Sequence, residues 1–286
     1  MNSKAIKTYL AIITAASLLF FAGCASLVSK PTRICPGKSS PAEAIAYLKA
    51  QIDDITAIKA YGLCKLKFHD ETGKKLKEAF PIRLWAKPPS QISLHANILF
   101  NPVAIIVGSN EDEFWITSTL MKSYAWGQFN DDGSMTLIEN VPTEVSSFSP
   151  QFLLDATGLI KIDDSSSWTL HNAGAFDVLE KHTLNGKITK RIHLYSCDYT
   201  IRTVEYLNDT GKVTAFVELD DYKIIAKGIN APHKIAVVQT DDAGLSTSAT
   251  IEFNKIEVAE LSDQQQQAFF SRPKPDGFKK ILKITE

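Results

Sequence analysis

Apolar and polar residues alternate along much of the chain after residue 57. Between Ile58 and Phe68 every second residue is apolar or small, and lysines fill several of the positions in between. The same period of two recurs over residues 80–86 and 92–96. Because successive side chains of a strand point to opposite faces, this period predicts antiparallel strands with one buried face and one wet face.

Turn signals divide the second half of the chain into further strands. The turns centre on Asn185-Gly186, Asn208–Gly211 and Asp241–Gly244. They separate expected strands over 175–183, 187–195, 199–207, 212–222, 233–240 and 246–258. Strands that return through hairpins about every 12 residues form a meander that curls into a barrel or half-barrel.

Two short stretches have helical signatures instead. Ser40–Glu43 is a capping box with proline at the first helical position, and the apolar residues after it follow helical spacing. Ser149-Pro150 begins a second, shorter helix that ends at Gly158. Strands and helices do not alternate, which excludes a doubly wound nucleotide-binding fold.

The N-terminus has the pattern of a secretory signal. Lys4 and Lys7 precede an apolar run over residues 10–22, which ends at Gly23-Cys24. A run of about 13 residues is too short for a helix to span ~30 Å of hydrocarbon. A plain N-terminal membrane anchor is the alternative interpretation. No other stretch reaches transmembrane length.

The end of this signal, Phe21-Ala22-Gly23-Cys24, resembles the lipobox of bacterial lipoproteins. The resemblance implies cleavage before Cys24, acylation of Cys24 and stable membrane anchoring. Ala25 and Ser26 follow, so the aspartate that retains such lipoproteins in the inner membrane is missing, which implies outer-membrane anchoring with the domain in the periplasm. The expected organisation is a signal peptide over 1–23, an acylated cysteine and tether over 24–40, and one domain over 41–286.

Composition narrows the class of protein. With 31 Lys and Arg against 32 Asp and Glu, the net charge of −1 argues against nucleic acid as a partner. In an oxidising compartment Cys35, Cys64 and Cys197 allow one disulfide and one spare thiol, or no disulfide. The cysteines and histidines show no metal-ligand spacing, and a thiol-redox motif is missing.

The search for catalytic motifs finds none of the common nucleotide, hydrolase or metalloprotease signatures. The six histidines are scattered, and the paired aspartates lie mostly in expected turns, where they cap backbone donors. We therefore expect a protein that is not an enzyme and that uses no cofactor or metal. An envelope hydrolase would require a clustered nucleophile and base.

Large apolar residues interrupt the strand alternation at several positions. Residues 98–103 form an apolar connection, and the segments 114–116 and 124–126 place aromatics on both faces of their strands. Trp85 and Trp115 fall on faces that the pattern leaves wet. These residues either fill a core or line an apolar cavity, and an exposed apolar loop marks a membrane or partner contact.

The order of these features resembles the LolA/LolB lipoprotein-carrier superfamily. The similar segments are Leu99–Val103, the strand pair from Trp115 to Trp126, the helix Ser149–Gly158, Val217–Tyr222 followed by Pro232–Ala236, and Phe269–Gly277. The resemblance implies an α+β fold, mainly antiparallel β, in which an unclosed half β-barrel has helices covering its concave face.

The same resemblance implies binding of an acyl chain or another apolar ligand, in lipid or lipoprotein transfer to the outer membrane. Ile98, Leu99 and Phe100 are then expected to contact the membrane or ligand. The expected cavity lining is Trp85, Leu94, Trp115 and Trp126. The alternative is a non-carrier envelope scaffold that uses the fold to dock a protein partner, with its barrel filled by side chains.

Overall fold

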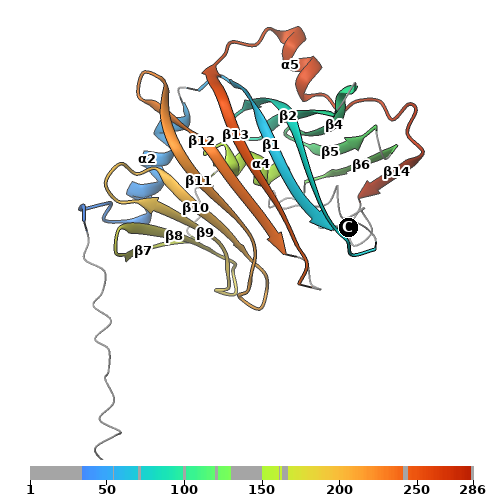
Figure 1. Ribbon diagram of the computed structural model, residues 1–286. Coiled ribbons are helices and arrows are strands. Elements are labelled where there is room, and N and C mark those ends of the chain that lie inside the picture. Colours follow the sequence, from blue (N-terminus) through green and yellow to red (C-terminus); the bar gives the residue numbers. More distant parts are fainter. Residues whose placement is uncertain are drawn as a thin grey trace, which may run out of the picture. The chain divides into compact units, whose positions relative to one another are not determined.

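The computed structural model describes residues 34–53, 55–69, 72–98, 101–119, 122–129, 150–160, 162, 167–240 and 244–284. The chain from residue 33 onward forms one compact unit. Its framework is a single 14-stranded sheet (Figure 1). Every neighbouring pair of strands is antiparallel except the last strand, which runs parallel to its neighbour.

The strands follow the chain in a long meander. They are β1 (Ile58–His69), β2 (Lys75–Lys87), β3 (Gln91–Ile98), β4 (Asn101–Ser109), β5 (Glu113–Ser118), β6 (Ser123–Gln128), β7 (Trp168–Ala173), β8 (Phe176–His182), β9 (Ile188–Tyr195), β10 (Ile201–Leu207), β11 (Val213–Ala226), β12 (Ile229–Thr240), β13 (Ser246–Val258) and β14 (Lys280–Ile284). Their order in the sheet is β14-β6-β5-β4-β3-β2-β1-β13-β12-β11-β10-β9-β8-β7. Pairing of β1 with β13 therefore joins the two halves of the chain.

The strands predicted from alternation and turn signals are confirmed within a few residues. The pattern did not predict β4, β7 or β14. Residues 98–103, interpreted above as a connection, contain the end of β3 and the start of β4, where Ile98 is in register with Asn101. A proline at the second position of β4 and a continuous apolar stretch hide the strand from a test for alternation.

Three helices accompany the sheet: α2 (Pro41–Asp53), α4 (Pro150–Ala156) and α5 (Asp263–Phe270). At the start of α2 the Glu43 amide donates to Ser40 Oγ at 3.2 Å, as the capping box predicts. The Glu43 carboxylate accepts from the Ser39 amide at 3.0 Å instead of from the Ser40 amide. The hydrogen bonds from the Ser39 amide and then from the Ser39 hydroxyl lower the pKa of Glu43.

The sheet curves around α4. This helix contacts β3 and β4 in one half of the sheet and β11 and β12 in the other half. Since β2, β1 and β13 lie between those pairs in the strand order, contact with both requires a concave face that faces the helix (Figure 1). α2 contacts β7, and its Ala44, Ile45 and Leu48 join the same core. The predicted fold class, an unclosed barrel with helices against its concave face, is confirmed.

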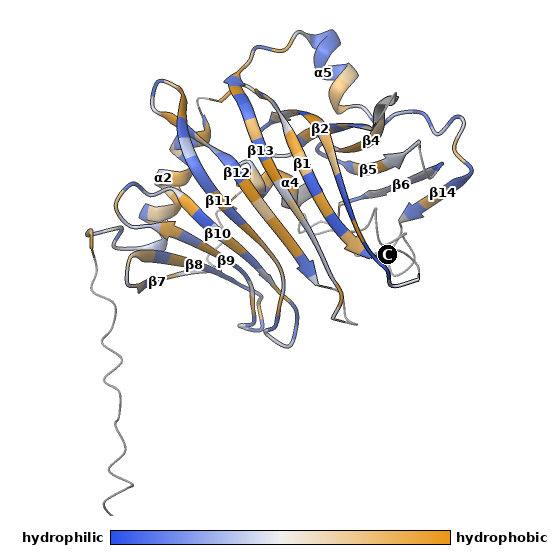
Figure 2. Ribbon diagram, in the orientation of Figure 1, coloured by the Kyte–Doolittle hydropathy of each residue, from blue (hydrophilic) through white to orange (hydrophobic). Residues whose placement is uncertain are grey.

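Strand alternation places the core on this concave face. The core includes Cys64 and Leu66 of β1, Leu84 of β2 and Val217 of β11, whereas the residues between them along β1 are polar and exposed, as at Lys65. Figure 2 shows the resulting change between hydrophobic and hydrophilic positions along β1, β11, β12 and β13. One apolar face therefore drives both the curvature and the packing of the helices.

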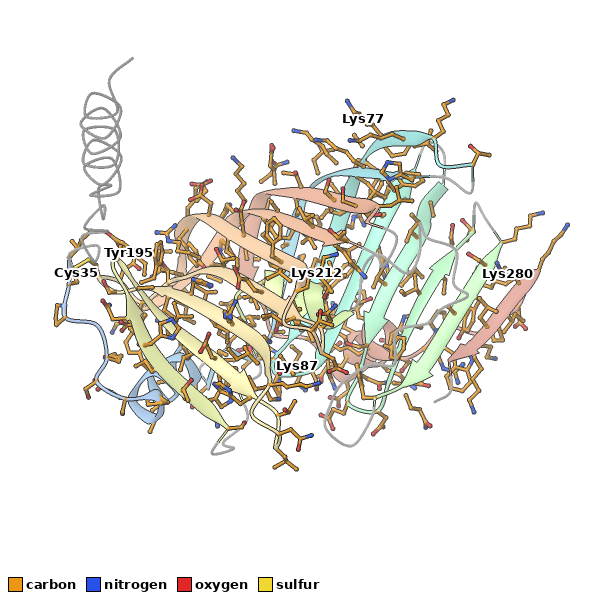
Figure 3. All side chains as sticks on the ribbon, turned by 90° about the horizontal axis from the view of Figure 1, so that it is seen from below. Cys35, Lys77, Lys87, Tyr195, Lys212 and Lys280 are labelled. Atoms are coloured by element: carbon orange, nitrogen blue, oxygen red, sulfur yellow. A yellow bond between two sulfur atoms is a disulfide. The ribbon has the colours of Figure 1, made fainter. Side chains whose placement is uncertain are left out.

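A disulfide joins the segment before α2 to the sheet. Cys35 is bonded to Cys197, which follows β9, across a sequence separation of 162 residues. Cys35 lies near Tyr195 in Figure 3, as this bond requires. Cys64 is a buried free thiol, and burial raises its pKa to about 12. The open question of pairing among the three cysteines is thereby answered.

Candidate functional site

The short helix α4 is the element that fills the concave face. Leu153 and Leu154 are 3% and 1% exposed, and Leu159, Ile160 and Ile162 continue the apolar contact after the helix ends. Gly158 has a φ of +78°, which lies in the left-handed region. Glycine adopts this conformation without steric strain and commonly ends helices for that reason. The predicted helix and its stop at Gly158 are therefore confirmed, and α4 lies against the concave face.

One ion pair ties α4 to the sheet. Lys190 of β9 donates from Nζ to Asp155 Oδ2 at 2.7 Å, and the two side chains are 11% and 0% exposed. Lys190 shares the concave face because Ile192 and Leu194, two and four residues later, lie in the core. Its Nζ also lies 5.2 Å from the centroid of the Tyr206 ring. The apolar face thus contains a buried charged pair beside α4.

The structure divides the predicted cavity residues between the two faces of the sheet. Leu94 lies in the core on the concave face, opposite Leu84 in the register of β2 and β3. Trp85 follows Leu84 and points the other way, where its ring stacks on Phe269 of α5 at a centroid distance of 4.2 Å. Leu94 therefore faces the α4 side, and Trp85 faces the convex side under α5.

His95 packs beside Trp85 on the convex side. The two ring centroids are 5.0 Å apart, and Ser93 Oγ lies 3.1 Å from His95 Nε2. Burial, with a smaller contribution from the charge of Arg83, lowers the pKa of His95. The imidazole of His95 is part of the packing around Trp85.

Trp115 and Trp126 also lie away from the concave core. They face each other across β5 and β6, while Phe114 and Ile116, on either side of Trp115, belong to the core. Trp115 is 1% exposed and lies over Gly108 of β4. The prediction that the three tryptophans line one cavity with Leu94 is therefore corrected, because strand alternation directs them to the opposite face.

The C-terminal segment covers these tryptophans. The guanidinium of Arg272 lies 3.9 Å from the centroid of Trp126, pairs with Glu113 at 2.8 Å and donates to Tyr124 Oη at 3.1 Å. Tyr124 Oη in turn donates to the carbonyl of Pro273 at 2.7 Å. Burial raises the pKa of Tyr124. We call residues 263–284, which comprise α5, β14 and the segment between them, the C-terminal strap.

The strap could have been found in part from the sequence. Ser262 and Gln265 form a capping box at the start of α5, a signal of the same kind that identified α2. The four glutamines over 264–267 that follow the cap lack apolar residues at helical spacing, and this concealed the helix. The predicted contact residues Leu99 and Phe100 lie outside the described residues, as does the side chain of Ile98, and so does Cys24.

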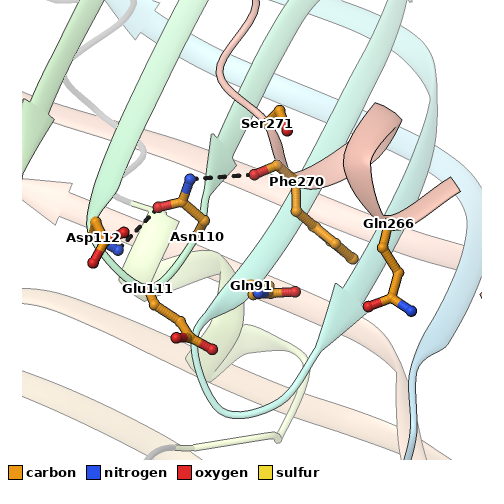
Figure 4. A pocket seen from close by; sticks show the side chains of 7 residues that line it. All are labelled: Gln91, Asn110, Glu111, Asp112, Gln266, Phe270 and Ser271. Atoms are coloured by element: carbon orange, nitrogen blue, oxygen red, sulfur yellow. Dashed lines mark hydrogen bonds between the residues drawn. The ribbon is translucent and has the colours of Figure 1, made fainter. Parts of the chain in front are cut away.

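A polar pocket of about 330 Å³ lies between the β4–β5 turn and α5 (Figure 4). It is lined by Gln91, Asn110, Glu111, Asp112, Gln266, Phe270 and Ser271. Asn110 Nδ2 donates to the Phe270 carbonyl at 3.3 Å, which joins the turn to the strap. The mostly polar lining does not suit an acyl chain, and the pocket is separate from the α4 face.

Within the described ranges, no group of three or more His, Cys, Asp or Glu residues is arranged to hold a metal ion. None of the helices in those ranges combines the length and the apolar content that crossing a bilayer requires. The chemistry available on the concave face is apolar burial together with the charged pair of Asp155 and Lys190.

Comparison of the sequence with known protein families and with curated proteins gives no match. The fold is similar to a domain from Vibrio parahaemolyticus assigned to outer membrane lipoprotein sorting, with 11% identity, a TM-score of 0.51, and coverage of 78% of this chain and 94% of that one. It is also similar to a DUF1329 family protein from Desulfovibrio piger, with 12% identity, a TM-score of 0.52, and coverage of 79% and 96%.

A LolA superfamily protein from Nitrosomonas europaea shows 9% identity and a TM-score of 0.48 over 79% of this chain and 97% of that one. At these identities the likeness establishes the fold alone. The likeness to the first two structures agrees with the fold that the sequence resemblance implied, an unclosed sheet with helices against its concave face.

Proposed function

We propose that this chain is a lipid-anchored protein of the bacterial cell envelope that binds an acyl chain or another apolar ligand on its concave face. In this role it would take part in lipid or lipoprotein transfer to the outer membrane. The observation that carries the proposal is α4, a short helix held against strands of both sheet halves by Leu153 and Leu154. An apolar ligand would take the place of these leucines.

The energies are compatible with such an exchange. Burying one leucine side chain stabilises by about 1.5–3 kcal/mol, so the two leucines contribute ~3–6 kcal/mol. An acyl chain gains ~0.8 kcal/mol for each buried methylene, so about eight methylenes offset the loss. A chain of ordinary lipid length therefore competes with α4 for the concave face.

A second candidate function follows from the same helix. A scaffold fills its barrel with side chains, and the side chains of α4 do fill the described part of the concave face. In that case α4 is a permanent part of the core and the protein docks a partner elsewhere. The two candidate functions differ in whether α4 leaves the concave face when the protein acts.

The test is displacement of the neutral reporter N-phenyl-1-naphthylamine by dodecanol. Replacing Leu154→Ala weakens the packing of α4 by about 2–5 kcal/mol. If α4 and the ligand compete, the variant binds dodecanol at least 10-fold more tightly than the unchanged protein does. Leu63→Ala is the control, because Leu63 lies on the convex face of β1 and should leave binding unchanged.

Circular dichroism of each variant separates lost binding from lost folding. Absence of dodecanol binding in both the unchanged protein and a folded Leu154→Ala variant would reject the carrier proposal and favour the scaffold. Equal affinities in the two proteins would reject the role of α4 as the competing element.

The envelope location rests on separate support. Disulfides such as that between Cys35 and Cys197 persist in oxidising compartments, and one structural neighbour is assigned to outer membrane lipoprotein sorting. We expect Cys24 to take up an alkyne-labelled palmitate in cells and the protein to sediment with outer membranes. Cys24→Ser should abolish both the label and the sedimentation. An unlabelled protein with Cys24 intact would refute the anchor.

The segment of Ile98, Leu99 and Phe100 stays the proposed contact with membrane or ligand. Leu99→Glu is expected to slow transfer of a fluorescent lipid to vesicles several-fold, because a carboxylate resists entry into an apolar surface. Leu184→Glu is the matched control, since Leu184 is fully exposed at the tip of the β8–β9 hairpin. Equal transfer rates for the two variants would remove the loop from the site.

A further inference from the structure

The buried pair of Asp155 and Lys190 connects the one element proposed to move with a fixed strand. Asp155 belongs to α4 and is 0% exposed, whereas Lys190 belongs to β9 and is 11% exposed. When α4 leaves the concave face, Asp155 leaves with it. Lys190 then remains on an apolar face without the carboxylate that balances its charge. Because an uncompensated buried charge is strongly unfavourable, a ligand that covers Lys190 in place of α4 is favoured if it brings an anion to this position.

A second lysine stands in the same row. Lys181 of β8 lies directly opposite Lys190 in the antiparallel register. It faces the concave side because Leu179, two residues earlier, lies in the core. Like charges directly opposite each other destabilise a strand pair, and with α4 in place the Asp155 carboxylate offsets this at Lys190. Tyr206 on the other side of Lys190 completes the row.

We propose that Lys190, assisted by Lys181, forms the head-group subsite of the ligand, and that the ligand is an anionic amphiphile. Its phosphate or carboxylate replaces Asp155 on Lys190, and its chain replaces Leu153 and Leu154 along the core. Asp155 thus serves as an internal substitute for the head group in the closed state. This inference rests on the proposed function, because it requires an apolar ligand that competes with α4.

The test compares two ligands that share one chain and differ in the head group. Dodecyl phosphate and dodecanol each displace N-phenyl-1-naphthylamine from the full folded domain, below the micelle concentration of the phosphate. The ratio of their affinities is the readout, because loosening of α4 affects both ligands and cancels in the ratio. We expect dodecyl phosphate to bind at least 10-fold more tightly than dodecanol.

Three variants test whether the head-group subsite causes the difference between the two affinities. Lys190→Met should reduce it several-fold, and the double variant Lys181→Met with Lys190→Met should bring it close to one. Asp155→Asn should increase the ratio, since Lys190 then lacks its internal anion. Lys212→Met, at an exposed position in the turn between β10 and β11, removes the same charge outside the row and should leave the ratio unchanged.

A single variant that leaves one buried charge unpaired could fail to fold. The double variant Asp155→Leu with Lys190→Met avoids this, because it removes both charges together and keeps the core apolar. It should bind dodecanol, and its preference for phosphate should be reduced several-fold, as in Lys190→Met. A ratio near one in the unchanged protein overturns the head-group subsite while leaving apolar binding intact. Failure of both ligands to bind overturns the proposed function and this inference together.

Discussion

At the scale of single residues, the contact between Gly108 and Trp115 determines how closely β4 and β5 approach on the convex face. A methyl group built on Gly108 would lie 2.6 Å from atoms of the Trp115 indole, closer than carbon atoms can pack. Trp115 is 1% exposed, so its ring has little room to move away. Glycine at position 108 is therefore required by the tryptophan beside it.

Gly108→Ala is expected to lower the free energy of unfolding by about 1–3 kcal/mol, as overpacking of a core does. Urea unfolding measures the loss. Combining it with Trp115→Leu should recover part of the stability, because the smaller side chain gives the methyl room. If the loss of unfolding free energy in the double variant equals the sum of the losses in the two single variants, the two residues do not compete for space.

Cys64 gives a prediction about alkaline pH. Burial raises the pKa of its thiol to about 12, while an exposed thiol titrates near 8.5. Below about pH 8.5 neither state ionises, so the stabilising effect of the neutral thiol is complete. Above it the unfolded chain ionises first, and stability falls with rising pH until the folded thiol titrates. The loss approaches about 1.4 kcal/mol for each pH unit.

Unfolding free energies of the unchanged protein and of Cys64→Ala, measured between pH 8 and 11, test this expectation. Cys64→Ala is less stable at pH 8 because of the cavity, and the difference between the two proteins should narrow as the pH rises. A difference that stays constant across this range would show that the Cys64 thiol does not titrate differently in the two states.

At the scale of elements, the C-terminal strap protects the convex face of β2 to β6. Phe269 covers Trp85, Arg272 covers Trp126, and β14 pairs in parallel with β6. Without the strap, these tryptophans would form an apolar patch on the convex surface, which favours association. The strap therefore explains why large aromatics can lie on the face that alternation predicts to be wet.

Arg272→Met should lower stability by about 1–2 kcal/mol, since it removes the contacts with Glu113, Tyr124 and Trp126 while retaining an apolar chain. Hydrogen exchange of β14 amides should speed up most, because Arg272 holds the strap beside that strand. Lys274→Met, at an exposed position two residues later, is the control. Unchanged exchange in β14 would show that Arg272 does not hold the strap.

The elements also show how much of the fold can be predicted from the sequence. Hairpins with an asparagine-glycine turn and clean alternation were predictable, since local chemistry determines them. β14 was not, because its five residues form a strand only through pairing with β6, more than 150 residues earlier. The burial of Trp85 on the face that alternation leaves solvent-exposed was not predictable for a related reason: its cover comes from α5, a distant part of the chain.

At the scale of the whole molecule, the Cys35–Cys197 disulfide secures the N-terminal segment of the compact unit. The Lys38 amide donates to the buried carboxylate of Asp177 at 2.8 Å, so a second contact fixes the same segment on β8. Sequence could show that a disulfide was feasible but not which cysteines pair, since pairing depends on the distance between turns that only the fold sets.

Replacing both Cys35→Ser and Cys197→Ser should lower the free energy of unfolding by about 2–5 kcal/mol, mainly because the unfolded chain gains freedom. Urea unfolding with and without a reductant measures this loss. The reductant should destabilise the unchanged protein and leave the double variant unaffected. A reductant effect in the double variant would contradict the assignment of the disulfide.

The candidate site was predictable in outline. The mid-chain helix and Leu94 were found from caps and alternation, and both lie on the concave face. Asp155 and Lys190 escaped notice because each reads as an ordinary charge in its own segment. The two residues are 35 positions apart, and only the curvature of the sheet brings Lys190 Nζ within 2.7 Å of Asp155 Oδ2. Pairs of this kind carry no local signal that a single sequence reveals.

The central claim is that the concave face accepts an apolar ligand in exchange for α4. Native mass spectrometry of the chain from residue 25, exported to a bacterial periplasm and purified without detergent, tests it most directly. The account predicts a bound mass of lipid size that increases in occupancy in Leu154→Ala. A ligand-free protein that also fails to take up dodecanol, with or without Leu154→Ala, would contradict the account.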